Sequence, residues 1–322
     1  MTLARLFALG GISITTLGCA AFNYTEPDGP IAELSAAPIH PRPEVALVLS
    51  SGGPRGYAHI GIMKVLDEAC IDYDLVVGSS VGSLIGAFWA SGLGVAEIDE
   101  IARGGGPLTL FDPSLFADRG WIRGQRLQDY VNSRLSAGAI ERLPRSLIVV
   151  ATRREDKAPV FFQRGNIGVA VRASSAMPGI ISPVGINGTE FEDADESLPV
   201  AVRAAREAGA RFVIAVDVSA KAGAAPDGTA RARLDRDAER RSRIDPEVAK
   251  ADFLIHPDLD YAAGPSRSYF LAAQAQGELS ARQSLPALVE RLRHAGVSGQ
   301  LDACASDGLK PPWASASLVS TR

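Results

Sequence analysis

The chain of 322 residues has little cysteine and little histidine, with three of the former and four of the latter. Three cysteines cannot form the disulfide framework of a small secreted domain, and the sequence contains no Cys-x-x-Cys pair. The histidines lie far apart, and none forms a cluster with cysteine at the spacing of a zinc site. We therefore expect no metal site.

Aromatic residues are also scarce, at 6%, and the net charge is only −4, from 33 Lys and Arg against 37 Asp and Glu. The chain thus lacks the aromatic platforms and the basic surface of nucleic-acid-binding proteins, and we expect no nucleic-acid partner. The 32 glycines and 20 prolines follow no fixed period, which excludes a collagen-like or coiled-coil rod. With 46% hydrophobic and 22% charged residues, the composition is that of a globular protein.

Residues 1–18 have the order of parts that is typical of an export signal. Arg5 precedes a mostly apolar run over residues 6–17, shorter than the roughly 20 residues that span a bilayer, and small residues follow around Cys19. The sequence Leu17-Gly18-Cys19-Ala20 resembles the cleavage box of bacterial lipoproteins, in which the cysteine becomes the lipidated first residue. The resemblance implies an exported protein that is anchored to a membrane of the cell envelope through Cys19. The alternatives are an ordinary secretory signal with an incidental cysteine and a buried first helix.

The rest of the chain divides into three parts by composition and periodicity. Residues 19–44 are rich in alanine, proline and small polar residues, which predicts a flexible tether. Residues 45–296 alternate short apolar runs with amphipathic segments and predict one α/β domain with a mainly parallel sheet. Residues 297–322 turn polar and small again and predict a poorly ordered tail. The predicted strands are 45–50, 75–77, 147–152, 160–163, 211–218 and 252–256, and the predicted helices are 55–69, 81–90, 125–135, 167–176, 199–208 and 268–294, the last kinked or split at Pro286.

Residues 231–243 are crowded with arginine, aspartate and glutamate. One interpretation is a basic face that meets anionic lipid headgroups. The other is a solvated helix with alternating charge. Because Asp235, Asp237 and Glu239 cancel much of the positive charge, we favour the solvated helix.

The sequence Gly78-Ser79-Ser80-Val81-Gly82 lies between a predicted strand and a predicted helix. A GxSxG sequence in this context places its serine in a tight turn with the hydroxyl exposed, and the following helix N-terminus favours negative charge there. The residues two before and two after the serine pack against the turn, where only glycine leaves room. This pattern predicts Ser80 as a nucleophile and Gly78 and Gly82 as the glycines that shape its elbow. A glycine–serine turn without chemistry is the alternative.

A second glycine-rich segment, Ser51-Gly52-Gly53-Pro54-Arg55-Gly56, follows the first predicted strand. Its glycines allow successive backbone N–H groups to point at one spot, where they can hold an anion or a developing oxyanion. A phosphate loop for a nucleotide is the competing interpretation. No Gly-Lys-Ser/Thr follows, and Ser51 stands where the dinucleotide fingerprint has its first glycine, so the pattern favours an oxyanion site.

A third segment, Phe191-Glu192-Asp193-Ala194-Asp195, offers carboxylates that could deprotonate Ser80, although by itself it could be a plain acidic turn. Together and in this order, the three motifs resemble those of the patatin-like phospholipases. The resemblance runs from about residue 45 to residue 294. It implies a three-layer α/β/α fold and a Ser–Asp dyad that cleaves acyl esters of lipids without histidine, metal or cofactor.

By this resemblance, Ser80 matches the nucleophile of the family, and Asp193, with Ala194, matches the Asp-Gly/Ala pair that carries the base. Gly52 and Gly53 match the oxyanion hole, and Arg55 and Gly56 complete its loop.

Three positions near these motifs leave questions open. Ser51 replaces the usual first glycine of the oxyanion loop. The segment from Asp193 to Leu198 is about two residues shorter than usual, which makes Asp195 a rival for the base. His59, beside the loop, matches a position that is not catalytic in the family, so we expect it to pack or to form hydrogen bonds.

The sequence as a whole predicts a serine acyl hydrolase of the phospholipase A or lysophospholipase type, with a lipid or acyl ester as substrate. The first alternative is a catalytically weak lipid-binding lipoprotein on the same fold, which Ser51 and the short segment after Asp193 suggest. The second is a nucleotide-binding module, which the missing lysine disfavours.

Overall fold

The computed structural model describes residues 23–25, 29–104 and 107–297 of the chain. The predicted export signal, the predicted lipidation site Cys19 and the predicted tail after Val297 lie outside the described residues.

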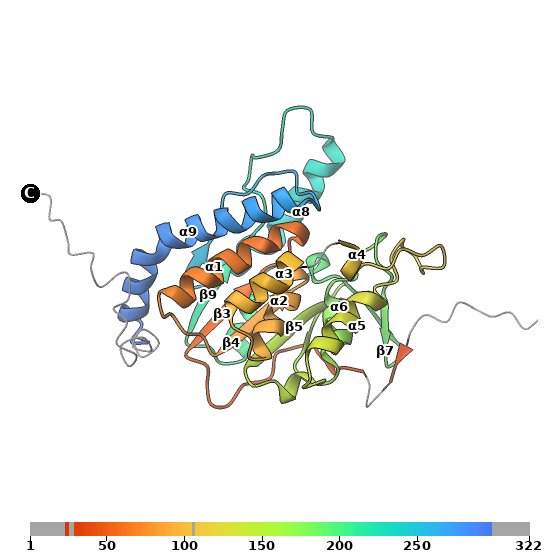
Figure 1. The fold of residues 1–322 in the computed structure, drawn as a ribbon, viewed down its shortest axis with the longest axis horizontal. Coiled ribbons are helices and arrows are strands. Elements are labelled where there is room, and N and C mark those ends of the chain that lie inside the picture. Colours follow the sequence, from red (N-terminus) through yellow and green to blue (C-terminus); the bar gives the residue numbers. More distant parts are fainter. Residues whose placement is uncertain (1–22, 26–28, 105–106, 298–322) are drawn as a thin grey trace, which may run out of the picture.

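A mixed, mostly parallel sheet forms the centre of this part of the chain (Figure 1). Its five parallel strands lie in the order β5-β4-β3-β9-β10. Strands β6 and β8 pair antiparallel with β5, strand β7 pairs antiparallel with β8, and the short strands β1 and β2 add to β7 and β6. The bounds are β1 (Asn23–Tyr24), β2 (Ala32–Glu33), β3 (Val45–Leu49), β4 (Leu75–Ser79), β5 (Ser146–Arg153), β6 (Pro159–Phe162), β7 (Val184–Ile186), β8 (Thr189–Glu192), β9 (Phe212–Val216) and β10 (Phe253–Ile255).

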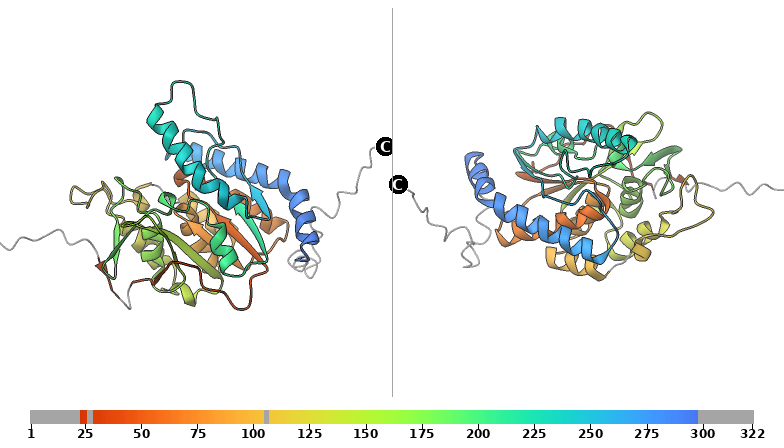
Figure 2. Two further views of the ribbon diagram at one scale, coloured as in Figure 1. Left: turned by 180° about the vertical axis from the view of Figure 1, so that it is seen from behind. Right: turned by 90° about the horizontal axis from the view of Figure 1, so that it is seen from above.

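Helices cover both faces of the sheet and complete three layers (Figure 2). Helices α1, α2, α3, α5, α6 and α9 enclose the larger of two apolar cores, and α7 and α8 cover the smaller one. Side chains alternate along a strand, so Leu47 of β3 belongs to the first core and Val48 to the second. The helices are α1 (Tyr57–Glu68), α2 (Val81–Ala90), α3 (Val95–Gly104), α4 (Pro107–Leu110), α5 (Gln125–Arg134), α6 (Ile167–Ser174), α7 (Val202–Glu207), α8 (Arg231–Val248) and α9 (Arg267–His294), with 3₁₀ turns η1 (Gly53–Gly56), η2 (Ile140–Arg142) and η3 (Ala194–Glu196).

Helices α1 and α9 approach each other closely at two glycines. A methyl group added at Gly61 of α1 would lie 2.1 Å from the carbonyl oxygen of Gln274, and one added at Gly277 of α9 would lie 2.2 Å from that of Ala58. Any larger residue would force the two backbones apart. Helix α9 thereby fixes α1, which follows directly after η1.

The charged segment 231–243 is helical, as the favoured interpretation predicts, and forms most of α8. Of the two effects predicted for Pro286, a split of the last helix is wrong, because α9 runs unbroken to His294. Its ribbon does bend in its C-terminal part, as the alternative of a kink predicts (Figure 1). None of the helices in the described ranges is long and apolar enough to cross a membrane.

The prediction of a flexible tether over residues 19–44 is wrong for its described residues. Strands β1 and β2 join the sheet, and Ala36 is buried. The amide of Ala36 donates to the Glu207 carboxylate at 2.8 Å, and the amide of Ile39 donates to the Ala208 carbonyl at 3.0 Å. Two-residue edge strands carry no periodicity that a sequence pattern could detect, because the backbone makes their contacts.

Candidate active site

Ser80 lies at the turn from β4 to α2, in the strained conformation that a nucleophile elbow requires. Its φ of 53° and ψ of −120° are unusual for a residue with a side chain. A methyl group at Gly78 would lie 2.5 Å from the carbonyl oxygen of Gly82, and one at Gly82 would lie 2.3 Å from the carbonyl oxygen of Leu49. Only glycine therefore fits at these two positions, as the GxSxG pattern predicts. The Ser80 amide donates to Ser174 Oγ at 2.8 Å, which ties the turn to the end of α6.

Asp193 is the carboxylate that meets the Ser80 hydroxyl. Ser80 Oγ donates to Asp193 Oδ2 at 2.8 Å, and the amide of Asp195 donates to Asp193 Oδ1 at 2.8 Å. The Asp193 backbone is fixed on both sides, because its amide donates to the Ala176 carbonyl at 3.0 Å and its carbonyl accepts from Thr152 Oγ1 at 2.8 Å. The carboxylate is therefore held in place for an acceptor role toward Ser80.

The environment of Asp193 makes its carboxylate more basic than usual. Its side chain is buried, and this burial is the main reason that the pKa of Asp193 rises to about 7. The negative charge of Asp195, and to a smaller extent that of Glu196, raises the pKa further. Hydrogen bonds from the Asp195 amide and the Ser80 hydroxyl act in the opposite direction. The result is a base whose pKa lies near neutral pH, where proton transfer is most effective.

Asp195, the rival for the base, has other partners. Its Oδ1 accepts hydrogen bonds from Arg240 Nε at 2.7 Å and from Ser51 Oγ. Arg240 also donates to Ser51 Oγ at 3.0 Å, so that the three residues form a closed hydrogen-bond network at the first residue of the oxyanion loop. Of the two aspartates, the geometry thus brings Asp193 to Ser80. The unusual Ser51 is part of the network that occupies Asp195.

The predicted oxyanion loop packs directly against the elbow. A methyl group at Gly56 would lie 2.4 Å from Cγ2 of Val81, the residue after Ser80, and Gly53 has a φ of 53°. A methyl group at Gly52 would lie 2.6 Å from Val218 Cγ2. Within the described ranges, neither the Gly52 nor the Gly53 amide forms a hydrogen bond with the protein. The oxyanion role predicted for these two N–H groups requires them to have no such partner.

Arg55 anchors this loop to a distant segment. Its guanidinium donates to the carbonyl of Tyr261, with longer bonds of 3.4 Å to the carbonyl of Asp260. The sequence left open whether Arg55 holds the loop or meets a headgroup, and these contacts support the first role.

His59 is buried, and its Nε2 donates to the Ser50 carbonyl at 2.9 Å. Burial lowers the pKa of His59 to about 4, which keeps the ring neutral. The expectation of a hydrogen-bonding role is therefore confirmed: His59 holds the end of β3, from which the oxyanion loop begins.

Sequence reasoning missed Arg240 and Arg241 as parts of the site. Helix α8 is largely exposed, but Arg240 turns toward Asp195, and Arg241 donates to the buried Asp217 at 2.7 Å. The one sequence feature that pointed to these two residues was the high arginine content of the segment that forms α8. Ser174 was also missed, although it lies within the range of residues 45–294 over which the sequence resembles the family.

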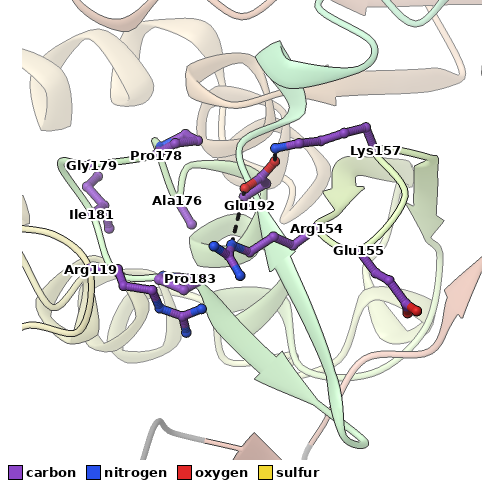
Figure 3. A pocket seen from close by; sticks show the side chains of 10 residues that line it. All are labelled: Arg119, Arg154, Glu155, Lys157, Ala176, Pro178, Gly179, Ile181, Pro183 and Glu192. Carbon is purple, nitrogen blue, oxygen red and sulfur yellow. Dashed lines mark hydrogen bonds and ion pairs between the residues drawn. The ribbon is translucent and has the colours of Figure 1, made fainter.

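A cavity of about 400 Å³ is lined in part by Glu192, the residue before Asp193 (Figure 3). Glu192 lies within it between Lys157 and Arg154 and forms an ion pair with each, so both cations have a carboxylate partner. No group of three His, Cys, Asp or Glu side chains in the described ranges could hold a metal ion. The cavity is lined by Arg119, Arg154, Glu155, Lys157, Ala176, Pro178, Gly179, Ile181, Pro183 and Glu192.

Comparisons with known proteins agree with this geometry. Residues 47–195 match the family described as patatin-like phospholipase. An uncharacterized NTE family protein of Mycobacterium tuberculosis is 38% identical over 192 residues, which cover 58% of this chain and 52% of that protein. The chain thus spans about half the length of this relative. A lysophospholipase of Aspergillus fumigatus is 29% identical over 179 residues, covering 54% of this chain and 12% of that protein.

Among solved structures, VipD from Legionella pneumophila superimposes with a TM-score of 0.52 at 14% identity, covering 81% of this chain and 70% of that one. At this identity the likeness concerns the fold alone. The chain therefore has the patatin fold, and its residues 47–195 match the patatin-like phospholipase family.

Proposed function

We propose that the protein is a serine hydrolase that cleaves the carboxylic ester bonds of lipids with Ser80 as nucleophile and Asp193 as base. One observation carries the proposal: in a strained elbow, Ser80 Oγ donates at 2.8 Å to a buried carboxylate. The match to patatin-like phospholipases, and a relative named as a lysophospholipase, support a lipid ester as the substrate.

In the first half of the reaction, the Asp193 carboxylate takes the proton of the Ser80 hydroxyl while Oγ attacks the ester carbonyl carbon. The carbonyl oxygen becomes an oxyanion, which the N–H groups of Gly52 and Gly53 stabilise. One such donor typically contributes about 3–4 kcal/mol to the transition state. The C–O bond of the ester then breaks, the alcohol leaves with the proton from Asp193, and the acyl group remains on Ser80.

In the second half, Asp193 accepts a proton from water, and the resulting hydroxide attacks the acyl carbon. Collapse of this intermediate returns the proton to Ser80 Oγ and releases the fatty acid. The pKa of Asp193, raised to about 7 by burial, suits it to both steps, because the group must accept and donate a proton near neutral pH.

Labelling with a fluorophosphonate tests the nucleophile directly. We expect the wild-type protein to be labelled at Ser80, the Ser80→Ala variant to stay unlabelled, and the Asp193→Asn variant to react far more slowly. A folded wild-type protein that resists the probe would support the alternative, a lipid-binding protein without catalytic power. Hydrolysis of an acyl chain-length series and of defined phospholipids and lysophospholipids then identifies the type of ester.

We further propose that the protein is exported and held at a membrane by lipidation of Cys19, as the order of parts in residues 1–20 indicates. The wild-type protein should then fractionate with membranes and resist extraction by high salt, and Cys19→Ser should release it or block its maturation. A wild-type protein that is soluble and carries no lipid by mass spectrometry would refute the anchor.

A further inference from the structure

Large apolar side chains are exposed together on two neighbouring segments of the structure. Leu115 is 100% exposed, Phe116 80% and Trp121 75%, all in the loop between α4 and α5. Met177 and Ile180, which follow α6, are 41% and 43% exposed. We call these five residues the apolar rim. Side chains of this size are normally buried, and a group of them on the surface marks a site of interaction.

The backbone holds the apolar rim in this exposed arrangement. The amide of Trp121 donates to the Ile180 carbonyl at 2.8 Å, and the Trp121 carbonyl accepts from the amide of Ser114 at 2.9 Å. At the base of the loop, the Asp112 carboxylate accepts from the Gly124 amide at 2.7 Å. Trp121 is thus fixed on both sides of its backbone while its indole ring faces solvent. These backbone hydrogen bonds fix the loop and thereby hold the Trp121 side chain in its exposed position.

The apolar rim is joined to the catalytic machinery. Met177 follows Ala176, whose carbonyl accepts the amide of Asp193 at 3.0 Å. Two residues earlier, Ser174 Oγ accepts the amide of Ser80. A surface that met the apolar rim would therefore lie at the edge of the site where Ser80 and Asp193 meet.

The apolar rim also lies at the end of the molecule where the chain enters the fold. Strand β1 pairs with β7 and lies on the same side of the molecule as the loop between α4 and α5 in all three views (Figures 1 and 2). The buried Arg172 links the two, because it donates to the Tyr24 hydroxyl of β1 at 3.0 Å and to the carbonyl of Arg123, near the end of the loop, at 2.8 Å. Cys19 precedes Asn23 by four residues, a span of at most about 14 Å.

From these observations we propose that the apolar rim docks on a lipid bilayer, with Leu115, Phe116 and Trp121 entering the boundary between headgroups and acyl chains. Leucine and aromatic side chains favour this boundary, and tryptophan in particular suits it because its ring is apolar and its N–H is polar. The proposal rests on a lipid ester as the substrate. A lipid anchor at Cys19 would hold the same end of the molecule at the same bilayer, and the docked surface would deliver lipid to the edge of the Ser80 site.

The fluorescence of Trp121 tests the proposal in the full-length Ser80→Ala protein. We expect a blue shift on addition of phosphatidylethanolamine–phosphatidylglycerol vesicles and strong quenching when their acyl chains are brominated. The Trp121→Phe, Ser80→Ala protein measures the background from the other tryptophans, of which Trp89 is buried. The matched control adds Leu279→Trp to that background. Leu279 is 49% exposed on α9, and a tryptophan there should not be quenched.

Three results would overturn the proposal. The first is an unquenched Trp121 in protein that sediments with the vesicles. The second is equal quenching of the tryptophan at position 279. The third is a blue shift without vesicles that accompanies dimer formation in sedimentation analysis, which would assign the apolar rim to a second copy of the chain. The fluorescence test uses the Ser80→Ala protein and therefore does not depend on ester hydrolysis. Failure of the wild-type protein to cleave any ester would refute the proposed function but would not affect the result of this test.

Discussion

Replacing Asp193 by asparagine should lower turnover by orders of magnitude and, above neutral pH, stabilise the folded protein. Asparagine can keep both contacts of the carboxylate, because its amide oxygen can accept from the Asp195 amide and its amide nitrogen can donate to Ser80 Oγ. It cannot accept the proton of the serine. Since a positioned general base typically contributes about 10²–10⁴-fold, we expect a loss of turnover in that range.

The gain in stability follows from the pKa of Asp193, which burial raises from 3.8 to about 7. Between these two values, the folded state keeps a proton that the unfolded state has lost. The free energy of unfolding of the wild-type protein therefore falls as the pH rises from about 4 to about 7 and stays level above that range. The difference between a pKa of 3.8 in the unfolded chain and about 7 in the folded protein sets an upper limit on the order of 4 kcal/mol for this loss of stability. Asparagine carries no charge that burial could destabilise, so the variant avoids this cost.

Urea unfolding of the wild-type and Asp193→Asn proteins at about pH 8 and about pH 5, together with hydrolysis of one ester, measures both effects. The variant should be more stable than the wild type at the higher pH, and this advantage should shrink at the lower pH. An advantage of equal size at both pH values would show that Asp193 is not the titrating group. A variant that is inactive but less stable at the higher pH would indicate a structural role for the carboxylate, and retained turnover would exclude it as the base.

Other perturbations test neighbouring parts of the site. In the wild type, kcat/KM should rise roughly tenfold between about pH 6 and about pH 8 as Asp193 ionises. Asp195→Asn should retain substantial turnover and move this acidic limb to lower pH, because it removes a negative charge that raises the pKa of Asp193; an unmoved limb would contradict the electrostatic argument. Arg240→Ala should move the limb to higher pH, because it leaves the Asp195 charge uncompensated, and Arg240→Lys should restore part of the shift. Gly78→Ala should lower the free energy of unfolding by about 1–3 kcal/mol or more, whereas Gly264→Ala, where an added methyl group meets nothing within 4 Å, should leave it unchanged in a urea titration. Hydrolysis should survive EDTA, and a loss that Ca²⁺ or Zn²⁺ restores would refute a mechanism without metal.

The features that the sequence predicts best are local ones. Strands β3 and β4 are short apolar runs, the first followed by serine and the second ending in glycine and serine, and both are fully buried, so composition alone identifies them. The elbow at Ser80 is also local, since a strand, a tight turn and a helix follow one another without interruption. The positions of Gly78 and Gly82 were therefore predictable, and the structure shows the close contacts that make glycine necessary there.

The features that the sequence missed depend on partners far along the chain. Strand β1 exists because its backbone pairs with β7, some 160 residues away, and no side-chain pattern records that pairing. Arg240 belongs to the site only because α8 lies across Asp195 and Ser51. The sequence left Asp193 and Asp195 as rivals because they are two residues apart, and only the arrangement of their hydrogen bonds separates them.

The glycine contact between α1 and α9 has a consequence for the order of events during synthesis. Helix α1 follows directly after the oxyanion loop, and it is packed by a helix that begins only at Arg267. Strand β9, which pairs with β3 ahead of that loop, also comes late, at Phe212. A chain still being translated therefore exposes Ser80 in its elbow before it can fix the loop that would stabilise an oxyanion. Contacts between such distant segments form slowly in any case. If the proposed function holds, we expect the nascent protein to be inactive toward lipid esters until α9 has been made.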